Sequence, residues 1–279
     1  MRKASHFSHS ASIVTGAASG IGRELARRLA ILGARVYAVD IDEKGLLDTK
    51  ERLGRDGVSM EIHRLDVTDG NAVRELFERI AGERGRIDYV FNNAGIAIVA
   101  ETQDMTGDLW RRIVEVNLMG VIHGATTAYR MMVKQGFGHI INTASLAGLV
   151  PVSSETAYTT TKFGVVGLSL SLRGEGRVLG VKVSVVCPGF VRTEIMQRVE
   201  VVGATREKYM QQMPPMMDVE KAVDVILRGV RKNRGIIPVG LDAWSLWLGY
   251  RIWPGLMTPI NNKIIRVLRN AKENASEDR

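Results

Sequence analysis

The stretch IVTGAASGIG, residues 13–22, decides the fold that we expect for this chain. Its first residues form an apolar run that ends in a glycine, and the next segment carries leucines at helical spacing as far as Gly33. A glycine turn between a strand and a helix lets the backbone approach a phosphate, and the helix N-terminus attracts negative charge. The stretch therefore predicts a dinucleotide-binding loop built on Gly16, Gly20 and Gly22.

The same alternation of short apolar runs and amphipathic segments continues from about residue 11 to residue 190. We expect further strands in RVYAVD, MEIHRLDV, IDYVFNNAG, HIINTAS, VKVSVVCPG and GIIPVG, with helices between them. This pattern predicts an α/β fold with a single doubly wound parallel sheet of Rossmann type and helices on both faces. In such folds ligands bind at the carboxyl ends of the strands.

The remaining segments flank or interrupt this pattern. We expect a polar leader over 1–10, one cofactor-binding and catalytic domain over 11–240 with a substrate loop at about 190–218, an apolar extension over 241–265 and a frayed, charged tail over 266–279. Residues 241–253 are apolar nearly all round, and a helix of this kind must be covered. This helix could pack over the substrate cleft, against a second subunit or on a membrane surface. We favour the first two.

Composition narrows the class of protein. The formal net charge is +8, but basic and acidic residues alternate along the chain without a dense basic cluster, so we expect no nucleic-acid partner. The single cysteine, Cys187, leaves no internal disulfide and suits a reducing compartment. Neither a signal-like apolar core in the first ten residues nor a membrane-length apolar run is present, so we expect a cytoplasmic location. The five histidines form no ligand set, so we expect no metal.

The stretch AYTTTK, residues 157–162, places Tyr158 one helical turn before Lys162. A free phenol has a pKa of about 10, and one cation roughly 4 Å away could bring that value near neutrality. The pair could then work as a tuned general acid and base. For an isolated Tyr-x-x-x-Lys pair, a half-buried tyrosine beside a solvated lysine is the commoner case. Other motifs must decide between the two interpretations.

Asp40 ends the second predicted strand, 40 − 22 = 18 residues after the last glycine of the loop. A carboxylate at this position can accept hydrogen bonds from the adenosine ribose and repel a 2′-phosphate, which favours NAD over NADP. Neither Ser19 nor Ile41 is a basic residue that could offset this repulsion. The alternative is an aspartate that only stabilises a turn.

Five motifs now stand in order, namely TGAASGIG, NNAG (residues 92–95), Ser145, YTTTK (residues 158–162) and PGFVRT (residues 188–193). With these motifs the chain resembles the short-chain dehydrogenase/reductase family over roughly residues 10–240. The resemblance implies four catalytic residues: Asn117, Ser145, Tyr158 and Lys162. Tyr158 would exchange a proton with the substrate oxygen that Ser145 binds. Lys162 would lower the pKa of Tyr158 and hold the nicotinamide ribose, and Asn117 would anchor a water relay.

The resemblance also implies the residues that contact the cofactor. Asp66 and Val67 would contact the adenine, Asn92 the cofactor backbone and Thr193 the nicotinamide carboxamide. The full expected set is Gly16, Ser19, Gly20, Ile21, Gly22, Asp40, Asp66, Val67, Asn93, Ala94, Gly95, Tyr158, Lys162, Pro188, Gly189, Val191 and Thr193.

We therefore expect an NAD(H)-dependent oxidoreductase that interconverts a secondary alcohol and a ketone. The methionines of the loop after Thr193 suit a bulky apolar substrate of the steroid, terpenoid or lipid kind, unless they only fill gaps in the core. The alternatives are an NADPH-dependent 3-oxoacyl-carrier-type reductase, against which Asp40 argues, and a non-catalytic NAD-sensing scaffold, which would not need Ser145, Tyr158 and Lys162. Family members usually form dimers or tetramers, so the resemblance also implies a homo-oligomer.

Overall fold

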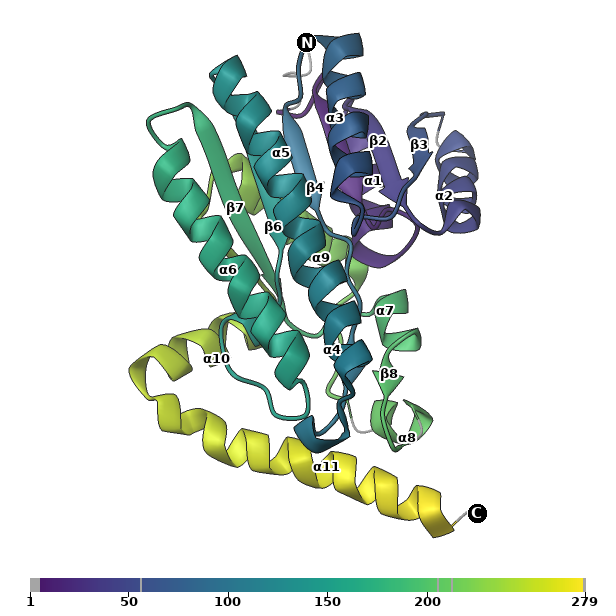
Figure 1. Cartoon of the computed structure of the whole chain (residues 1–279), viewed down its shortest axis with the longest axis vertical. Coiled ribbons are helices and arrows are strands. Elements are labelled where there is room, and N and C mark those ends of the chain that lie inside the picture. The colour runs from purple at the N-terminus through teal and green to yellow at the C-terminus, as the bar shows by residue number, and fades with distance from the viewer. Residues whose placement is uncertain (1–5, 56, 205, 212, 278–279) are drawn as a thin grey trace.

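The computed structural model describes residues 6–55, 57–204, 206–211 and 213–277, and a seven-stranded sheet lies at its centre (Figure 1). All strand pairs of this sheet are parallel, and the strand order is β3-β2-β1-β4-β6-β7-β9. The strands are β1 (Ala11–Thr15), β2 (Arg35–Asp40), β3 (Glu61–Arg64), β4 (Tyr89–Asn92), β6 (Gly138–Thr143), β7 (Val181–Pro188) and β9 (Ile236–Val239). The predicted doubly wound parallel sheet is confirmed.

Helices cover both faces of the sheet (Figure 1). They are α1 (Gly20–Ile31), α2 (Glu43–Arg55), α3 (Gly70–Arg84), α4 (Gly107–Val114), α5 (Gly120–Gln135), α6 (Thr156–Gly176), α7 (Glu194–Gln197), α8 (Arg206–Met210), α9 (Val219–Arg231), α10 (Leu241–Ile252) and α11 (Met257–Glu277). A π-helical turn (Glu115–Met119) joins α4 to α5. A separate ladder pairs β5 (Ile98–Val99) with β8 (Glu200–Val201).

The two layers follow from the alternation of side chains along each strand. In β1, Val14 points into a core shared with α1 and α9, whereas Ile13 points into a second core shared with α3 and α5. Both residues are fully buried. The strand order reverses between β1 and β4, and at such a switch point the loops after neighbouring strands part and leave a crevice. The glycine loop after β1 and the NNAG loop after β4 border this crevice.

The first described residues already belong to the core. Phe7 is 1% exposed and packs in the core on the α1 side of the sheet. The amide of His9 donates a hydrogen bond to the carbonyl of Gly33 at 2.8 Å. Residues 6–10 of the expected polar leader are therefore docked on the domain, while residues 1–5 lie outside the described part of the chain.

Within the described part of the chain, only one face of helix α10 packs against other residues. Ala243 and its half-buried neighbours Leu246 and Tyr250 pack against the loop around Val150. The other face carries an exposed stripe, Leu241, Trp244, Leu248 and Ile252, spaced three or four residues apart. No helix of the described residues is long and apolar enough to span a membrane.

Helix α11 continues through the segment for which the composition predicts a frayed tail, and Figure 1 shows it running past the N-terminal ends of α4 and α6. Leu268 is fully buried on one face of the helix. On another, Arg269 and Lys272 form ion pairs with Glu101, which lies in the loop before α4. Leu268 and Ala271 are buried among charged residues, so residues 266–272 pack against the domain and do not form the expected frayed tail, and the helix itself continues to Glu277. Residues 278–279 lie outside the description.

We predict that Leu268→Ala lowers the free energy of unfolding by about 2–5 kcal/mol, because the substitution opens a cavity among Val99, Val199 and Tyr209. Asn270→Ala, on the exposed side of α11, is the control and should change stability by less than about 0.5 kcal/mol. Urea denaturation of the three proteins measures both values. Equal stability of the two variants would show that α11 does not dock in solution.

Candidate active site

A cleft of about 620 Å³ opens at the carboxyl ends of the parallel strands. Most of the predicted site residues line it, although they come from segments far apart in the sequence. They are Gly16, Ser19, Gly20, Ile21, Asp40, Asp66, Val67, Asn93, Ala94, Gly95, Ser145, Tyr158, Lys162, Pro188, Gly189, Val191 and Thr193. Three of the expected residues do not line the cleft, and the position of each is explained below: Gly22, Asn92 and Asn117.

The glycine loop is as tight as a phosphate-binding turn requires. Gly16 and Gly20 have φ angles of +69° and +53°, which side chains other than hydrogen rarely allow. Gly22 lies beneath the loop, where an added Cβ would overlap the carbonyl oxygen of Gly16. The loop backbone can therefore approach a ligand closely, and the first turn of α1 carries no acidic residue of its own that would repel a pyrophosphate. These features fit the phosphates of a dinucleotide.

A carboxylate from the substrate loop reaches this turn. Glu194, at the start of α7, accepts a hydrogen bond from the amide of Gly20 at 2.8 Å and forms an ion pair with Arg23 at 2.9 Å. The methyl-bearing carbon of Thr193 lies close to Gly20 in the same corner. The loop after β7 is thus tied to the beginning of α1.

Asp40 both stabilises a turn and faces the cleft. Its Oδ2 accepts a hydrogen bond from the amide of Ala18 at 2.9 Å, and its Oδ1 accepts one from the amide of Asp42 at 3.0 Å. Asp40 can therefore stabilise the turn and also face a bound ribose, so the two interpretations of this residue are compatible. Arg198 also lines the cleft, but its guanidinium is paired with Asp42 at 3.2 Å.

Asn92 points into the core, contrary to the role in cofactor binding that we expected for it. The side chain is 2% exposed, and its amide group donates a hydrogen bond to Asn142 at 2.8 Å. Successive residues of a strand point to opposite faces, so Asn93 turns the other way and lines the cleft. The side-chain amide of Asn93 donates to the carbonyl of Thr15 at 3.3 Å, which joins the NNAG loop to the end of β1.

Asn117 lies in the π-helical turn, fully buried behind the cleft wall. Its Oδ1 accepts a hydrogen bond from the amide of Ile96 at 2.8 Å, and its Nδ2 donates one to the carbonyl of Ile96 at 2.9 Å. The whole side-chain amide is thus engaged with one backbone residue of the loop after β4. The water relay that the resemblance implies for Asn117 stays a prediction.

Ser145, Tyr158 and Lys162 meet at the centre of the cleft. Tyr158 and Lys162 lie in the first two turns of α6, and Ser145 follows β6. The ammonium of Lys162 donates a hydrogen bond to the carbonyl of Thr143 at 3.1 Å and lies 5.4 Å from the centre of the Tyr158 ring. The three groups surround a space in which a substrate oxygen can bind beside the phenol.

Burial controls the protonation of this group of residues. It raises the pKa of Tyr158, and although the Ser145 side chain lowers that pKa, the negative charge of Glu155 raises it further. Burial also lowers the pKa of Lys162 from 10.5 to about 8. The net shift is opposite in direction to the one that we expected, because burial of the phenol outweighs the groups that lower its pKa. The role of Lys162 in lowering the pKa of Tyr158 stays a prediction. At neutral pH the phenol is protonated and can donate a proton.

The outer wall of the cleft is largely apolar and comes from β5 and from the segment predicted as the substrate loop. Ile98, Val99, Val199 and Tyr209 form much of it. Among the loop methionines, Met196 and Met213 line the cleft, whereas Met210 and Met217 pack against core clusters. Some of the loop methionines are therefore available to an apolar substrate, and others fill gaps in the core. The sequence analysis also missed Glu155, although this residue precedes Tyr158 by only three positions.

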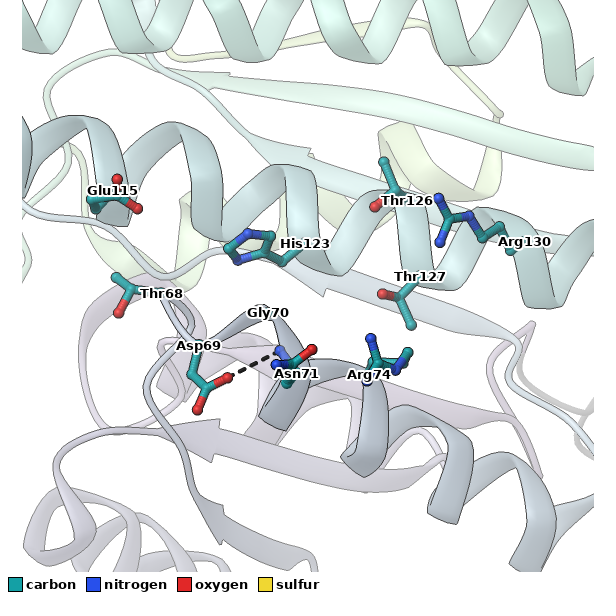
Figure 2. Close-up of a pocket in the computed structure, with 10 residues that line it drawn as sticks. All are labelled: Thr68, Asp69, Gly70, Asn71, Arg74, Glu115, His123, Thr126, Thr127 and Arg130. Atoms are coloured by element: carbon teal, nitrogen blue, oxygen red, sulfur yellow. Dashed lines mark hydrogen bonds between the residues drawn. The ribbon is translucent and has the colours of Figure 1, made fainter.

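A second hollow of about 520 Å³ lies between α3 and α5 (Figure 2). Figure 2 shows Arg74 and Arg130 at one end and Thr68 and Glu115 at the other, with Asp69 bonded to the first turn of α3. None of the predicted catalytic residues lines this hollow. We therefore place the active site in the larger cleft.

Comparison with known proteins identifies the family of this chain. Residues 10–201 match the family model described as short chain dehydrogenase. The oxidoreductase EphD of Mycobacterium tuberculosis is 34% identical over 264 residues, which cover 91% of this chain but 45% of that protein. A 3beta-hydroxysteroid dehydrogenase of Eggerthella lenta is 35% identical over 186 residues, which cover 66% of this chain and 72% of that protein. The chain thus spans about half the length of the first of these relatives.

Solved structures share the fold over most of their length. A short-chain dehydrogenase/reductase from Burkholderia phymatum in complex with NAD has a TM-score of 0.81 at 28% identity, covering 90% of this chain and 96% of that chain. A short-chain dehydrogenase from Sphingobium yanoikuyae in complex with NADPH has a TM-score of 0.75 at 30% identity, covering 89% and 95%. The fold is therefore found with either cofactor.

We predict that Lys162→Met stabilises the protein at pH 7. The folded-state pKa of Lys162 lies below its ordinary value, so the cost of burying the ammonium is fully present below about pH 8 and is lost as the pH rises through 10.5. Each kcal/mol recovered should raise the Tm by about 2–4 °C. Lys134→Met, at an exposed position of α5, is the control.

Thermal melts at pH 7 and pH 10 test this prediction. The advantage of Lys162→Met should shrink at the higher pH, because the wild type gains stability there. A variant that melts at or below the wild-type temperature at pH 7 would show that the buried ammonium does not destabilise the fold.

Proposed function

We propose that this chain, which belongs to the short-chain dehydrogenase/reductase family, is an NAD(H)-dependent oxidoreductase that interconverts a secondary alcohol and a ketone. One observation carries the proposal, namely that Ser145, Tyr158 and Lys162 lie together in the cleft that also contains the glycine loop. A protein that only senses the nucleotide would have no use for a buried phenol and a buried ammonium beside the binding site. Burying these two groups is unfavourable for folding, and a role of both groups in catalysis explains why the protein retains them.

The residues of the cleft divide the work of the reaction. Bound NAD(H) supplies the hydride chemistry, with the glycine loop and Asp40 holding its adenosine half. In ketone reduction, the protonated Tyr158 donates its proton to the oxygen that Ser145 orients by a hydrogen bond. In alcohol oxidation, the phenol must first lose that proton, and the positive charge of Lys162 stabilises the phenolate that results. The apolar outer wall keeps water from the reacting centre.

Asp40 supports the preference for NAD. Its carboxylate faces the cleft, and backbone hydrogen bonds from Ala18 and Asp42 fix its position. A 2′-phosphate near this group would meet an unfavourable negative charge. Two nearby cations are already paired with acids, Arg198 with Asp42 and Arg23 with Glu194. An NADPH-dependent reductase of the acyl-carrier type fits this arrangement less well.

The walls of the cleft support a bulky, mainly apolar substrate. Ile98, Val99, Val199, Met196 and Met213 offer aliphatic and thioether surface opposite the catalytic residues. A steroid, a terpenoid or another lipid-like alcohol is the class that we propose. The similarity to a 3beta-hydroxysteroid dehydrogenase is in keeping with this class.

The outer face of α6 supports self-association. Phe163 and Leu170 are 41% and 40% exposed and lie two helical turns apart on one face, where a second copy could cover them. We therefore keep the prediction of a homo-oligomer, a dimer or a tetramer. The cytoplasmic location also stays a prediction.

We predict that Tyr158→Phe lowers kcat by about 10²-fold or more with an unchanged Kd for NADH, because the substitution removes only the transferable proton. Initial rates with a panel of steroid, terpenoid, acyl and short-chain ketones and alcohols measure the effect. Tyr129→Phe, which alters a phenol on α5 outside the cleft, is the control. Near wild-type turnover of Tyr158→Phe would remove the role of Tyr158 as acid and base.

We predict that wild type binds NADH more tightly than NADPH and that Asp40→Ala reduces this preference roughly tenfold or more, since the repulsion of the 2′-phosphate is lost. Fluorescence titration with both cofactors gives the four dissociation constants. Asp48→Asn, on the exposed side of α2, removes a nearby charge outside the cleft and should leave the ratio unchanged. Comparable constants for the two cofactors in the wild type would contradict the role of Asp40.

A further inference from the structure

Glu155 is a second ionisable group in the candidate active site, and the reaction proposed above does not use it. It precedes α6 by one residue and lines the cleft with Tyr158 and Tyr209. Burial raises the pKa of both tyrosines, and the negative charge of Glu155 raises each further, so the carboxyl lies near both phenols. Burial also raises the pKa of Glu155 itself, to about 7.

The carboxyl of Glu155 has no hydrogen-bond or ion-pair partner among the residues that the structure describes. The other acid in the lining of the outer cleft, Glu200, is paired with Arg112. A half-buried carboxyl that lines an apolar cleft without a partner is unfavourable, and proteins normally satisfy such groups. The chain instead leaves this one facing an apolar wall, in the space where a substrate must lie.

The backbone before Glu155 is strained and firmly held. Ser154 has a φ of +65°, a left-handed conformation that is unfavourable for a serine, and it is 3% exposed. Its carbonyl accepts a hydrogen bond from the amide of Ala100 at 2.7 Å. On the other side, Asn261 of α11 accepts a hydrogen bond from the amide of Ser153 at 3.0 Å. Two loops and the C-terminal helix therefore fix the direction in which Glu155 leaves the backbone.

We propose that Glu155 is a substrate-recognition residue whose carboxyl accepts a hydrogen bond from a second hydroxyl group of the substrate. The cleft would then select a bulky, otherwise apolar alcohol or ketone that carries this hydroxyl near the reacting carbon. This inference rests on the proposed oxidoreductase function and names its substrate more closely.

The spacing of Glu155 and Tyr158 sets the distance between the two oxygens of the substrate. Glu155 lies just before α6 and Tyr158 in its first turn, and the charge of the carboxyl is close enough to raise the pKa of the phenol. The second hydroxyl would therefore lie near the reacting carbon. A carboxylate substrate is disfavoured, because its charge would meet that of Glu155 in a medium of low dielectric.

Pairs of alcohols that differ by one hydroxyl test the proposal. The probes are cyclohexanol with trans-cyclohexane-1,2-diol, and a monohydroxy steroid with its vicinal diol. Wild type, Glu155→Leu and Glu155→Gln are compared, with Asp108→Asn as the control because Asp108 is an exposed acid at the start of α4. For each protein we measure the ratio of kcat/KM between the two members of a pair. The rise in Tm caused by each alcohol with NADH present is measured as well, since it needs no turnover.

We expect wild type and Asp108→Asn to favour the diol of at least one pair roughly tenfold or more, as a hydrogen bond to a charged group allows. Glu155→Leu should bring that ratio to about one while it keeps turnover of the mono-alcohol. Glu155→Gln should keep part of the preference, because its amide oxygen still accepts a hydrogen bond.

Two results would overturn the inference: an unchanged ratio in Glu155→Leu, or an equal loss of activity with both members of a pair. If wild type turned over neither member, the proposed function would fail for these alcohols. The Tm comparison would still decide the role of Glu155, since equal Tm shifts by the diol and the mono-alcohol would exclude it.

Discussion

The close approach of backbone to backbone at the glycine turn is the constraint on which the rest of the site depends. Gly22, in the first turn of α1, lies directly beneath the carbonyl of Gly16, and an added Cβ at Gly16 would lie 2.8 Å from the Cα of Ala94. These approaches bring α1, the end of β1 and the loop after β4 into one compact corner. Thr15 strengthens the corner, because its hydroxyl accepts hydrogen bonds from the amides of Asn93 and Ala94. Every other group of the cleft is placed relative to this corner.

The active site is an unstable part of a stable fold. Lys162 is 3% exposed, and the cleft also holds the carboxyl of Glu155 and the phenol of Tyr158. None of these groups would be selected for stability alone, because burial shifts each of them away from its charged form. Two large apolar cores on either side of the sheet offset this cost. The protein thus concentrates unfavourable electrostatics at the one edge where chemistry requires it.

The sequence predicted the fold because periodicity and turn chemistry agree over most of the chain, as they do around Gly16 and Gly22. It failed where the outcome depends on three-dimensional packing. Two adjacent asparagines on a strand cannot both face the cleft, because side chains alternate between its two faces. The packing of β4 in the sheet decides that Asn92 points into the core. The charged composition of residues 266–272 obscured an amphipathic part of α11. The direction of the pKa shift of Tyr158 depends on burial, which no local motif encodes. Glu155 was a single acid with no motif around it.

The π-helical turn between α4 and α5 constrains how many residues can separate these two helices. One extra residue per turn rotates everything after it by about 100° compared with an uninterrupted α-helix. Ile113 can therefore face the loop cluster before the turn, while Ala125 and Ala128 face the sheet after it. Deleting a single residue from Glu115–Met119 would restore α-helical phase and turn the wrong side of α5 toward the core. The number of residues in this turn is therefore constrained, as is the identity of Asn117, whose side-chain amide bonds both backbone groups of Ile96.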